Sequence, residues 1–298
     1  MSITRRRARS GWGFVLPFAI FFTAFFIIPI VYAVYQSLFK VERTGSLGLS
    51  GSKQVFVWFD NYAAALSDAA FVDSLVRILI FAVIQVPVMV ILAVALALLL
   101  DAASARGVPF FRSAYFLPYG VPGVVASILW GFLYTPGISP IVTLLNDLGL
   151  NVDFLGTDNI LLSIINIVTW QFAGYNMLVL VAQLKSINPD LYESARMDGA
   201  GAWRIVWNIK LPLARPAIVM VTVFTIVGTL QLFSEPLVLK PLTGAINFTY
   251  TPNLTAYNEA FNKDNYQMAA AQAVLLAVVA MVFSFGFLRL FGRGDDES

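Results

Sequence analysis

The chain has 298 residues, of which 59% are apolar and 12% are charged, and its formal net charge is +2. Soluble domains carry about 25% charged residues, so the composition argues against a soluble globule. The absence of cysteine and histidine excludes disulfide frameworks, thiolate nucleophiles and the commonest metal ligand and general base. The basic residues lie in the loops between apolar segments, so the sequence does not predict nucleic-acid binding.

Six stretches are long and apolar enough to cross a bilayer, which needs about 20 apolar residues. They are Gly13–Leu38, Leu75–Leu100, Phe110–Tyr134, Ile160–Leu184, Ala217–Leu239 and Met268–Phe291. Pro118, Gly120, Pro122 and Gly123 interrupt the third stretch. We expect a kinked span there, because neighbouring helices can satisfy the freed backbone groups. The predicted fold class is an all-α integral membrane protein with six transmembrane helices over residues 13–291.

The orientation of these spans follows from the positions of Lys and Arg, which accumulate on the cytoplasmic side. Of the 19 basic residues, 13 lie on one side: before the first span, at or after the end of the last, or in and at the edge of the two loops of that side. Both termini are therefore predicted to be cytoplasmic, with residues 1–12 forming a basic N-terminus and 292–298 a short tail. The outer segments would be 40–74, 135–159 and 240–267, with a short interfacial helix at residues 140–150.

A basic start followed by an apolar run could also be a signal peptide. The apolar run here covers about 26 residues, longer than the 7–15 residues of a signal-peptide core, and no small-residue cleavage site follows it. We therefore expect a first helix that is retained.

A charged, glycine-broken insert over residues 186–215 separates the fourth and fifth spans. Its residues 188–190 (Asn-Pro-Asp) predict a helix start, because Asn caps, Pro suits the first helical position and Asp favours the positive end of the helix dipole. Gly199 should end this helix in a left-handed or close-packed conformation. A second short helix is predicted over 203–209, ended by Pro212. From spacing alone, an amphipathic helix lying on the membrane is an equal alternative.

The insert also carries a pattern that resembles the coupling-loop motif of binding-protein-dependent ABC importer permeases. The matching positions are Glu193, Ala195, Asp198, Gly199, Ala200, Ile209, Leu211 and Pro212. Ser194 departs from the motif, which has alanine there. Residues 56–66, 111–134 and 170–200 resemble the sugar-transporting branch, which includes permeases for maltose, other oligosaccharides and glycerol-3-phosphate. Residues 239–254 lack the Gly-Gly-Pro run that is common in this branch.

This resemblance implies a type I ABC importer permease in the plasma (inner) membrane of a prokaryote. The chain would form half of a pore with a second, homologous permease subunit. Two cytoplasmic ATP-binding cassette subunits would receive the coupling loop, and an extracytoplasmic sugar-binding protein would deliver the substrate. ATP and Mg²⁺ would bind the partner ATPases, because this chain has no phosphate-cradling G-x-x-x-x-G-K-[ST] loop. No cofactor, metal or catalytic residue is expected on this chain.

Glu235 is the ionisable residue expected deepest in a span, where such residues are costly and usually functional. Gln231 lies four residues earlier, so an unbroken helix would place both on one face. There they would hydrogen-bond sugar hydroxyls, while Phe233 stacks on a sugar ring. The alternative is that Glu235 lies at the outer interface, solvated or paired with Lys240.

A second candidate cluster lies in the fourth span and comprises Gln171, Tyr175 and Asn176. In the maltose permease a Gly-Tyr stretch lines the sugar site, and Gly174-Tyr175 resembles it. The alternative is that Gln171 and Asn176 provide hydrogen bonds between helices, as such residues commonly do in membranes.

Two further classes of protein are alternatives to an importer permease: a secondary transporter and an intramembrane enzyme. A secondary transporter driven by an ion gradient would favour buried carboxylates near the midplane and discontinuous helices. Glu235 alone fits that description, and the charged insert would be unexplained. An intramembrane enzyme ranks third, because the chain offers no His, no Cys and no carboxylate pair.

Overall fold

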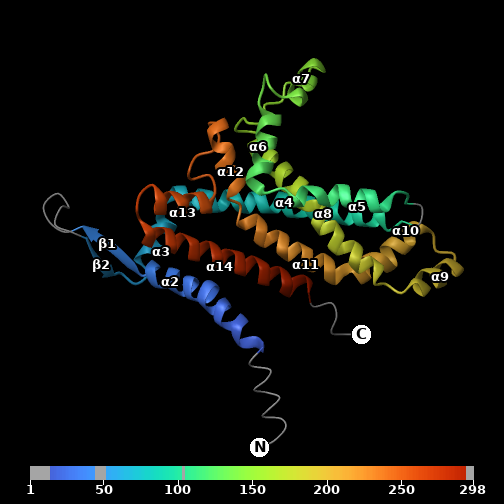
Figure 1. Ribbon diagram of the computed structural model, residues 1–298, viewed down its shortest axis with the longest axis horizontal. Coiled ribbons are helices and arrows are strands. Elements are labelled where there is room, and N and C mark those ends of the chain that lie inside the picture. Colours follow the sequence, from blue (N-terminus) through green and yellow to red (C-terminus); the bar gives the residue numbers. More distant parts are fainter. Residues whose placement is uncertain (1–13, 44–51, 103–104, 293–298) are drawn as a thin grey trace, which may run out of the picture. The chain divides into compact units, whose positions relative to one another are not determined.

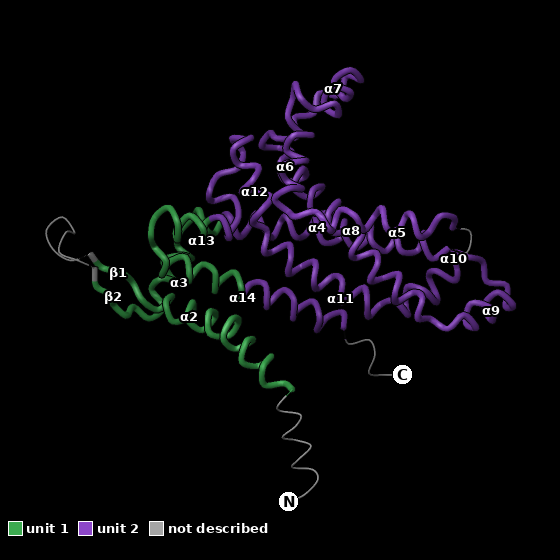
Figure 2. The backbone as a smooth tube through the Cα atoms, viewed as in Figure 1, with its two compact units in different colours: residues 1–72, 255–277 green, residues 73–254, 278–298 purple. Residues whose placement is uncertain are grey.

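The structure is a computed structural model that describes residues 14–43, 52–102 and 105–292 (Figure 1). Five of its helices are long and apolar enough to cross a membrane, or six if a sharply bent helix pair counts as one span. The predicted architecture of membrane-spanning helices is therefore confirmed. The chain divides into two compact units, drawn in different colours in Figure 2.

Unit 1 comprises residues up to Val72 and Thr255–Ala277. Its first helix covers Phe14–Ser37 and contains a π-helical turn. Its elements are η1 (Thr23–Ile27), α2 (Ile28–Ser37), β1 (Phe39–Arg43), β2 (Ser52–Phe56), α3 (Asp60–Ser67), the start of α4, most of α13 (Pro252–Phe261) and the first half of α14 (Tyr266–Phe291). The apolar window of the first helix buries nothing against the chain, which leaves its surface for lipid or another subunit.

The strands β1 and β2 are a departure from the all-α prediction. The strands pair antiparallel with Phe39 opposite Phe56. The rings of these two phenylalanines lie edge to face, with centroids 5.2 Å apart. The alternation of apolar and charged residues in β1 has the period of two that is typical of strands. The side chain of Asn61 donates to the carbonyls of Ser37 and Phe39 at 2.8 and 2.6 Å, which ties α3 to the base of the hairpin.

Unit 2 comprises Asp73–Leu254 and Val278–Ser298. Its elements are most of α4 (Ala69–Leu100), α5 (Val108–Phe116), η3 (Leu117–Gly120), α6 (Gly123–Tyr134), α7 (Pro140–Asp147), α8 (Ile160–Lys185), α9 (Pro189–Met197), α10 (Ala202–Ile205), η4 (Val206–Lys210), α11 (Leu211–Leu230), α12 (Ser234–Leu239), η5 (Lys240–Leu242) and the end of α14. The short helix predicted at residues 140–150 is observed as α7, and its place at the membrane interface stays a prediction.

Helix α8 is the centre of unit 2, with 67% of its apolar window buried. Its side chains contribute to two apolar clusters, around Ile164 and Ile167 in one and around Met177 and Leu180 in the other. A helix that is apolar on all sides is expected to be buried. Helix α8 therefore provides a fixed frame against which the neighbouring helices pack.

The third predicted span is two half-helices, α5 with η3 and then α6, bent by 99° at the break. Pro122 caps α6 in an extended conformation. The Nε2 of Gln171 in α8 donates to the carbonyl of Val121 at 2.8 Å. This is the compensation expected at a proline in a membrane helix, because a neighbouring side chain satisfies a freed backbone group.

The fifth span differs from the prediction at both ends. Pro212 does not stop a helix, because α10 continues through the π-helical η4 into α11, with Pro212 at the second position of α11. A π-helical turn widens the helix locally, which accommodates a residue that lacks an N–H. At its C-terminal end α11 stops at Leu230, and α12 begins at Ser234. Gln231 and Glu235 are therefore not on one helix face, and that prediction was wrong.

The break before α12 has a local cause. Pro236 lies in the first turn of α12, where the N–H that proline lacks would have no intrahelical partner. Phe233, which precedes α12, has φ −146° and ψ −53°, outside the helical region. The chain therefore changes direction between α11 and α12, next to the cavity described below.

Candidate functional site

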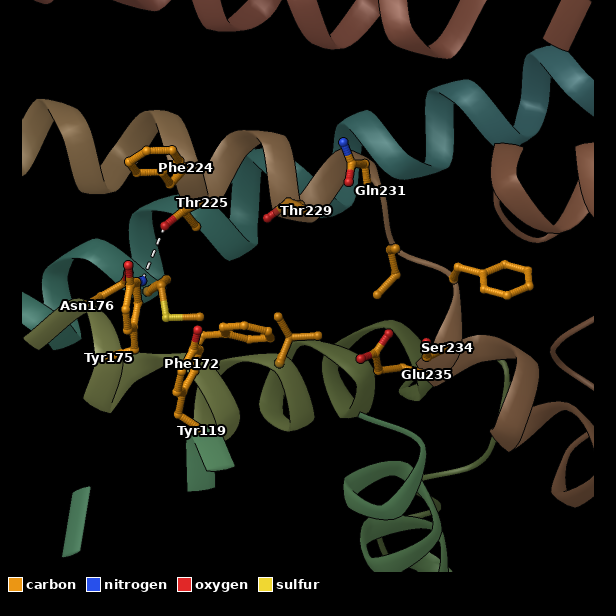
Figure 3. A pocket seen from close by; sticks show the side chains of 15 residues that line it. Tyr119, Phe172, Tyr175, Asn176, Phe224, Thr225, Thr229, Gln231, Ser234 and Glu235 are labelled. Carbon is orange, nitrogen blue, oxygen red and sulfur yellow. Dashed lines mark hydrogen bonds between the residues drawn. The ribbon is translucent and has the colours of Figure 1, made fainter. Parts of the chain in front are cut away.

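A cavity of about 420 Å³ lies within unit 2 (Figure 3), in the size range of small-molecule pockets. Its polar lining comes from α8, α11, α12 and the break between the last two, and comprises Asn176, Thr225, Thr229, Gln231, Ser234 and Glu235. Its aromatic lining comprises Tyr119, Phe172, Tyr175, Phe224 and Phe233. Met89, Val168, Gly228 and Leu232 complete it.

Aromatic rings form one wall of the cavity. The rings of Tyr119 and Tyr175 are stacked, with centroids 4.7 Å apart and planes 17° apart. Phe172 meets Tyr119 edge to face at 5.8 Å. Tyrosine presents an apolar ring together with a hydroxyl that seeks a partner. This wall can therefore pack against an apolar face of a ligand and hydrogen-bond to its rim.

Asn176 of α8 and Thr225 of α11 face each other in the polar lining of the cavity. Asn176 is 5% exposed, and its Nδ2 donates to Thr225 Oγ1 at 3.3 Å, the dashed line in Figure 3. Thr225 Oγ1 in turn donates to the carbonyl of Val221 at 2.8 Å. The predicted role of Asn176 in bonding between helices is thus observed, and the residue also faces the cavity.

Glu235 is the acidic group of the cavity and is 8% exposed. Its carboxylate adjoins the break before α6: a Cβ placed on Gly123 would lie 3.3 Å from Glu235 Oε1. Within the described residues it forms no ion pair, and Lys240 instead lies over the Phe248 ring at 4.0 Å. The alternative of a Glu235–Lys240 pair is therefore not observed.

The structure brings together five of the seven predicted substrate residues: Tyr175, Asn176, Gln231, Phe233 and Glu235. The other two, Gln171 and Gly174, do not line the cavity and have other roles in α8. Gln171 supports the break before α6, as described above. A Cβ on Gly174 would lie 1.7 Å from the Tyr115 carbonyl oxygen, so this glycine permits the close crossing of α5 and α8.

Sequence reasoning missed Phe172, Thr225 and Thr229 as cavity residues. Phe172 lies three and four residues before Tyr175 and Asn176, and the two threonines are four apart, so each set shares a helix face. This spacing was a usable signal, although phenylalanines in a membrane helix are mostly lipid or packing residues.

The predicted coupling loop folds as a helix, a tight turn and a second helix. Asn188 caps α9 by accepting from the Asp190 N–H at 3.0 Å. Gly199 has a φ of +79°, and the Ala200 N–H donates to the Ala195 carbonyl at 2.9 Å. This is the left-handed glycine cap that closes many helices. The predicted helix start and the left-handed conformation of Gly199 are confirmed.

The surface of this loop combines charge with exposed apolar groups. Glu193 and Asp198 are exposed, and Met197 and Trp203 are 89% and 73% exposed. Ala195, Ala200, Ile209 and Leu211 are half-buried, and Pro212 is exposed. Exposed apolar groups gathered in one segment mark a contact surface for another protein or a membrane.

An ion pair that the sequence analysis did not predict anchors the loop to the end of α4. Lys210 Nζ lies 2.6 Å from Asp101 Oδ2, which follows the end of α4, and the two side chains are 12% and 15% exposed. Lys210 also lies 5.5 Å from the ring centroid of Tyr192 in α9. Burial raises the pKa of the Tyr192 phenol, and the charge of Asp101 raises it further. The pair joins α4, α9 and η4.

Apolar spanning helices, an internal cavity and an anchored polar loop define a membrane transport subunit. The chain belongs to the family of binding-protein-dependent transport system inner membrane components, whose pattern matches residues 62–294.

Curated relatives align over nearly the whole chain. The sn-glycerol-3-phosphate transport system permease protein of Agrobacterium fabrum is 32% identical, over 92% of this chain and 92% of the relative. The diacetylchitobiose uptake system permease protein of Streptomyces coelicolor is 30% identical, over 95% of this chain and 83% of the relative. A chain of a bacterial alginate ABC transporter shares the fold, with a TM-score of 0.83, 23% identity and 98% coverage of both chains.

Proposed function

We propose that this chain is the permease subunit of an ATP-driven importer of saccharides in the plasma membrane of a prokaryote. The observation that carries the proposal is the cavity, whose lining combines stacked tyrosines with amide, hydroxyl and carboxyl groups. Sugars offer apolar ring faces and many hydroxyls, and both find partners in such a lining. The relatives include permeases named for diacetylchitobiose, lactose and trehalose, which supports the same substrate class.

The chain would work within an assembly. A second, homologous permease completes the pore, and an extracytoplasmic sugar-binding protein delivers the substrate. A bacterial alginate ABC transporter has been solved in complex with such a saccharide-bound periplasmic protein. Two ATP-binding cassette subunits dock on the coupling loop (residues 186–215) through Glu193, Asp198 and the exposed apolar groups. They carry the ATP and Mg²⁺, and this chain catalyses no reaction. Residues 13–291 form the membrane domain, and the segments that precede and follow it in the chain, 1–12 and 292–298, both lie in the cytoplasm.

Transport would follow from two states of the spans that ATP binding to the cassettes stabilises differently. The breaks at Pro122 and between α11 and α12 flank the cavity and provide points where half-helices can change angle. Discontinuous helices are also a feature of secondary transporters, so they do not discriminate between the two classes. Membership of the binding-protein-dependent family supports the ATP-driven mechanism.

The test is uptake of labelled di- and trisaccharides by the reconstituted importer. Losing one partner of a buried hydrogen bond costs about 1–3 kcal/mol, or about 5–150-fold. Asn176→Ala and Gln231→Ala should therefore weaken uptake within that range, with basal ATP hydrolysis intact. Thr222→Ala is the matched control, because Thr222 is buried in α11, bonds to Ile218 and does not line the cavity. Wild-type uptake in both cavity variants would place the substrate elsewhere.

Glu235 allows a second comparison in the same assay. If its carboxyl group accepts hydrogen bonds from sugar hydroxyls, Glu235→Gln should impair uptake less than Glu235→Ala, because the amide oxygen still accepts. Equal impairment by the two variants would remove Glu235 from the proposed contacts.

A further inference from the structure

We infer that the cavity accepts uncharged or amino-bearing saccharides and discriminates against phosphate esters and uronates. The inference rests on the proposed function and narrows its substrate class. The relatives differ in the charge of the substrates they are named for: one is named for sn-glycerol-3-phosphate, an anion, and others for the neutral sugars lactose and trehalose. The solved structure that shares the fold belongs to a transporter of alginate, an acidic polysaccharide.

The charge of the cavity lining carries the argument. Among the residues that the structure describes, the lining includes one carboxylate, Glu235, and no lysine or arginine. Two basic residues of the same unit have partners elsewhere. Lys240 lies over the Phe248 ring, and Arg77 donates to the carbonyls of Thr249 and Tyr250 at 3.3 and 3.0 Å.

A phosphate or carboxylate in this cavity would lose its hydration without gaining a cation. Anionic groups are bound tightly where arginine, lysine or clustered N–H donors replace the lost water. Here an ionised Glu235 would add like-charge repulsion in a site of low dielectric. An ammonium group on an amino sugar would instead pair with it. A neutral sugar requires hydrogen-bond partners only, and Asn176, Gln231 and the threonines offer them.

The protonation state of Glu235 does not reverse this preference. A protonated carboxyl group donates one hydrogen bond and accepts others, which suits hydroxyl groups equally well. It removes the repulsion of an anion but supplies no positive charge. Neutral sugars are therefore preferred over anionic ones in both states, and ionisation of Glu235 increases the difference; the gain for an amino-bearing sugar requires the ionised carboxylate.

The experiment measures sugar binding to the purified importer complex in lipid nanodiscs, with saccharides that differ in one charged group. The pairs are maltose with maltose phosphate, and cellobiose with cellobiouronic acid, with chitobiose as the amino-bearing ligand. We expect each anionic member to bind at least about tenfold more weakly than its neutral partner, equivalent to about 1.4 kcal/mol. Chitobiose should bind at least as tightly as cellobiose.

A variant then assigns the discrimination to its source. Glu235→Gln should strengthen binding of the two anionic ligands relative to their partners and remove any advantage of chitobiose over cellobiose. Glu259→Gln is the matched control: Glu259 is a buried carboxylate, 6% exposed, whose partners are Lys263 and Asn265, and it does not line the cavity. Its binding profile should equal that of the wild type.

The possible results distinguish a failure of the saccharide proposal from a failure of the charge preference. If none of the five ligands binds the wild-type complex, the saccharide proposal itself fails, and the inference with it. If neutral sugars bind and their anionic partners bind as tightly or more tightly, the saccharide proposal stands and the charge preference is refuted. A wild-type preference that Glu235→Gln leaves unchanged would refute the role assigned to Glu235. The wild-type comparison needs no variant, so a misfolded variant would not affect it.

Discussion

The ion pair between Lys210 and Asp101 gives the sharpest prediction about coupling. Replacing Lys210 with methionine keeps most of the unbranched apolar stem and removes the charge, which leaves Asp101 unpaired at 15% exposure. Losing one partner costs about 3–5 kcal/mol for a fully buried pair, whereas an exposed pair contributes about 0.2–1 kcal/mol. At this partial burial we expect a loss of about 1–3 kcal/mol, or about 5–150-fold in the population that holds the loop in place.

The consequence should appear in coupling rather than in assembly. Helix α9 packs on this pair through Tyr192, so Lys210→Met should loosen the coupling loop against α4 and η4. We expect faster amide exchange over α9 and fewer sugar molecules transported per ATP hydrolysed by the reconstituted importer. The two measurements are hydrogen exchange of the complex and the ratio of uptake to phosphate release.

The chain offers a matched control in a second ion pair. Lys263 and Glu259 lie 2.5 Å apart, but the Lys263 side chain is 58% exposed, so Lys263→Met should change neither measurement. The double variant Asp101→Asn with Lys210→Met removes both charges and should recover part of the loss. Unchanged exchange and coupling in Lys210→Met, or a double-mutant coupling energy below about 0.5 kcal/mol, would refute the reasoning.

Three further predictions concern single positions. Gly174→Ala places a Cβ 1.7 Å from a backbone oxygen, so the free energy of unfolding, measured by thermal unfolding in detergent, should fall by more than the about 1–3 kcal/mol that overpacking usually costs. Gly286→Ala is the neutral control, because a Cβ there would have no atom within 4 Å. Gly199→Val should cost about 1–2 kcal/mol at a φ of +79° and reduce co-purification of the ATPase; normal recovery and ATP hydrolysis would contradict this. In the cysteine-free chain, Asn151→Cys should react with an impermeant maleimide from outside sealed cells and Ser186→Cys should not; the reverse pattern would overturn the orientation.

The sequence by itself determined the spans and the loop. Long apolar runs predict membrane helices because a bilayer leaves the backbone few other ways to satisfy its hydrogen bonds. The start of α9 and the left-handed Gly199 followed from capping and glycine chemistry, which act over a few neighbouring residues. The offsets of the coupling-loop motif likewise lie within a short segment, so the family resemblance was readable without a fold.

Only the tertiary structure decided which polar residues share the cavity. Gln171 and Asn176 have similar chemistry and lie five residues apart in one helix, yet one supports the break before α6 and the other faces the cavity. Gln231 and Glu235 line the same cavity, although the helix that would have joined them is broken. Asp101 meets Lys210 from 109 positions away in the chain. These contacts depend on how α4, α8 and α11 pack against one another. The periodicity of one helix does not show which of its faces a neighbouring helix covers.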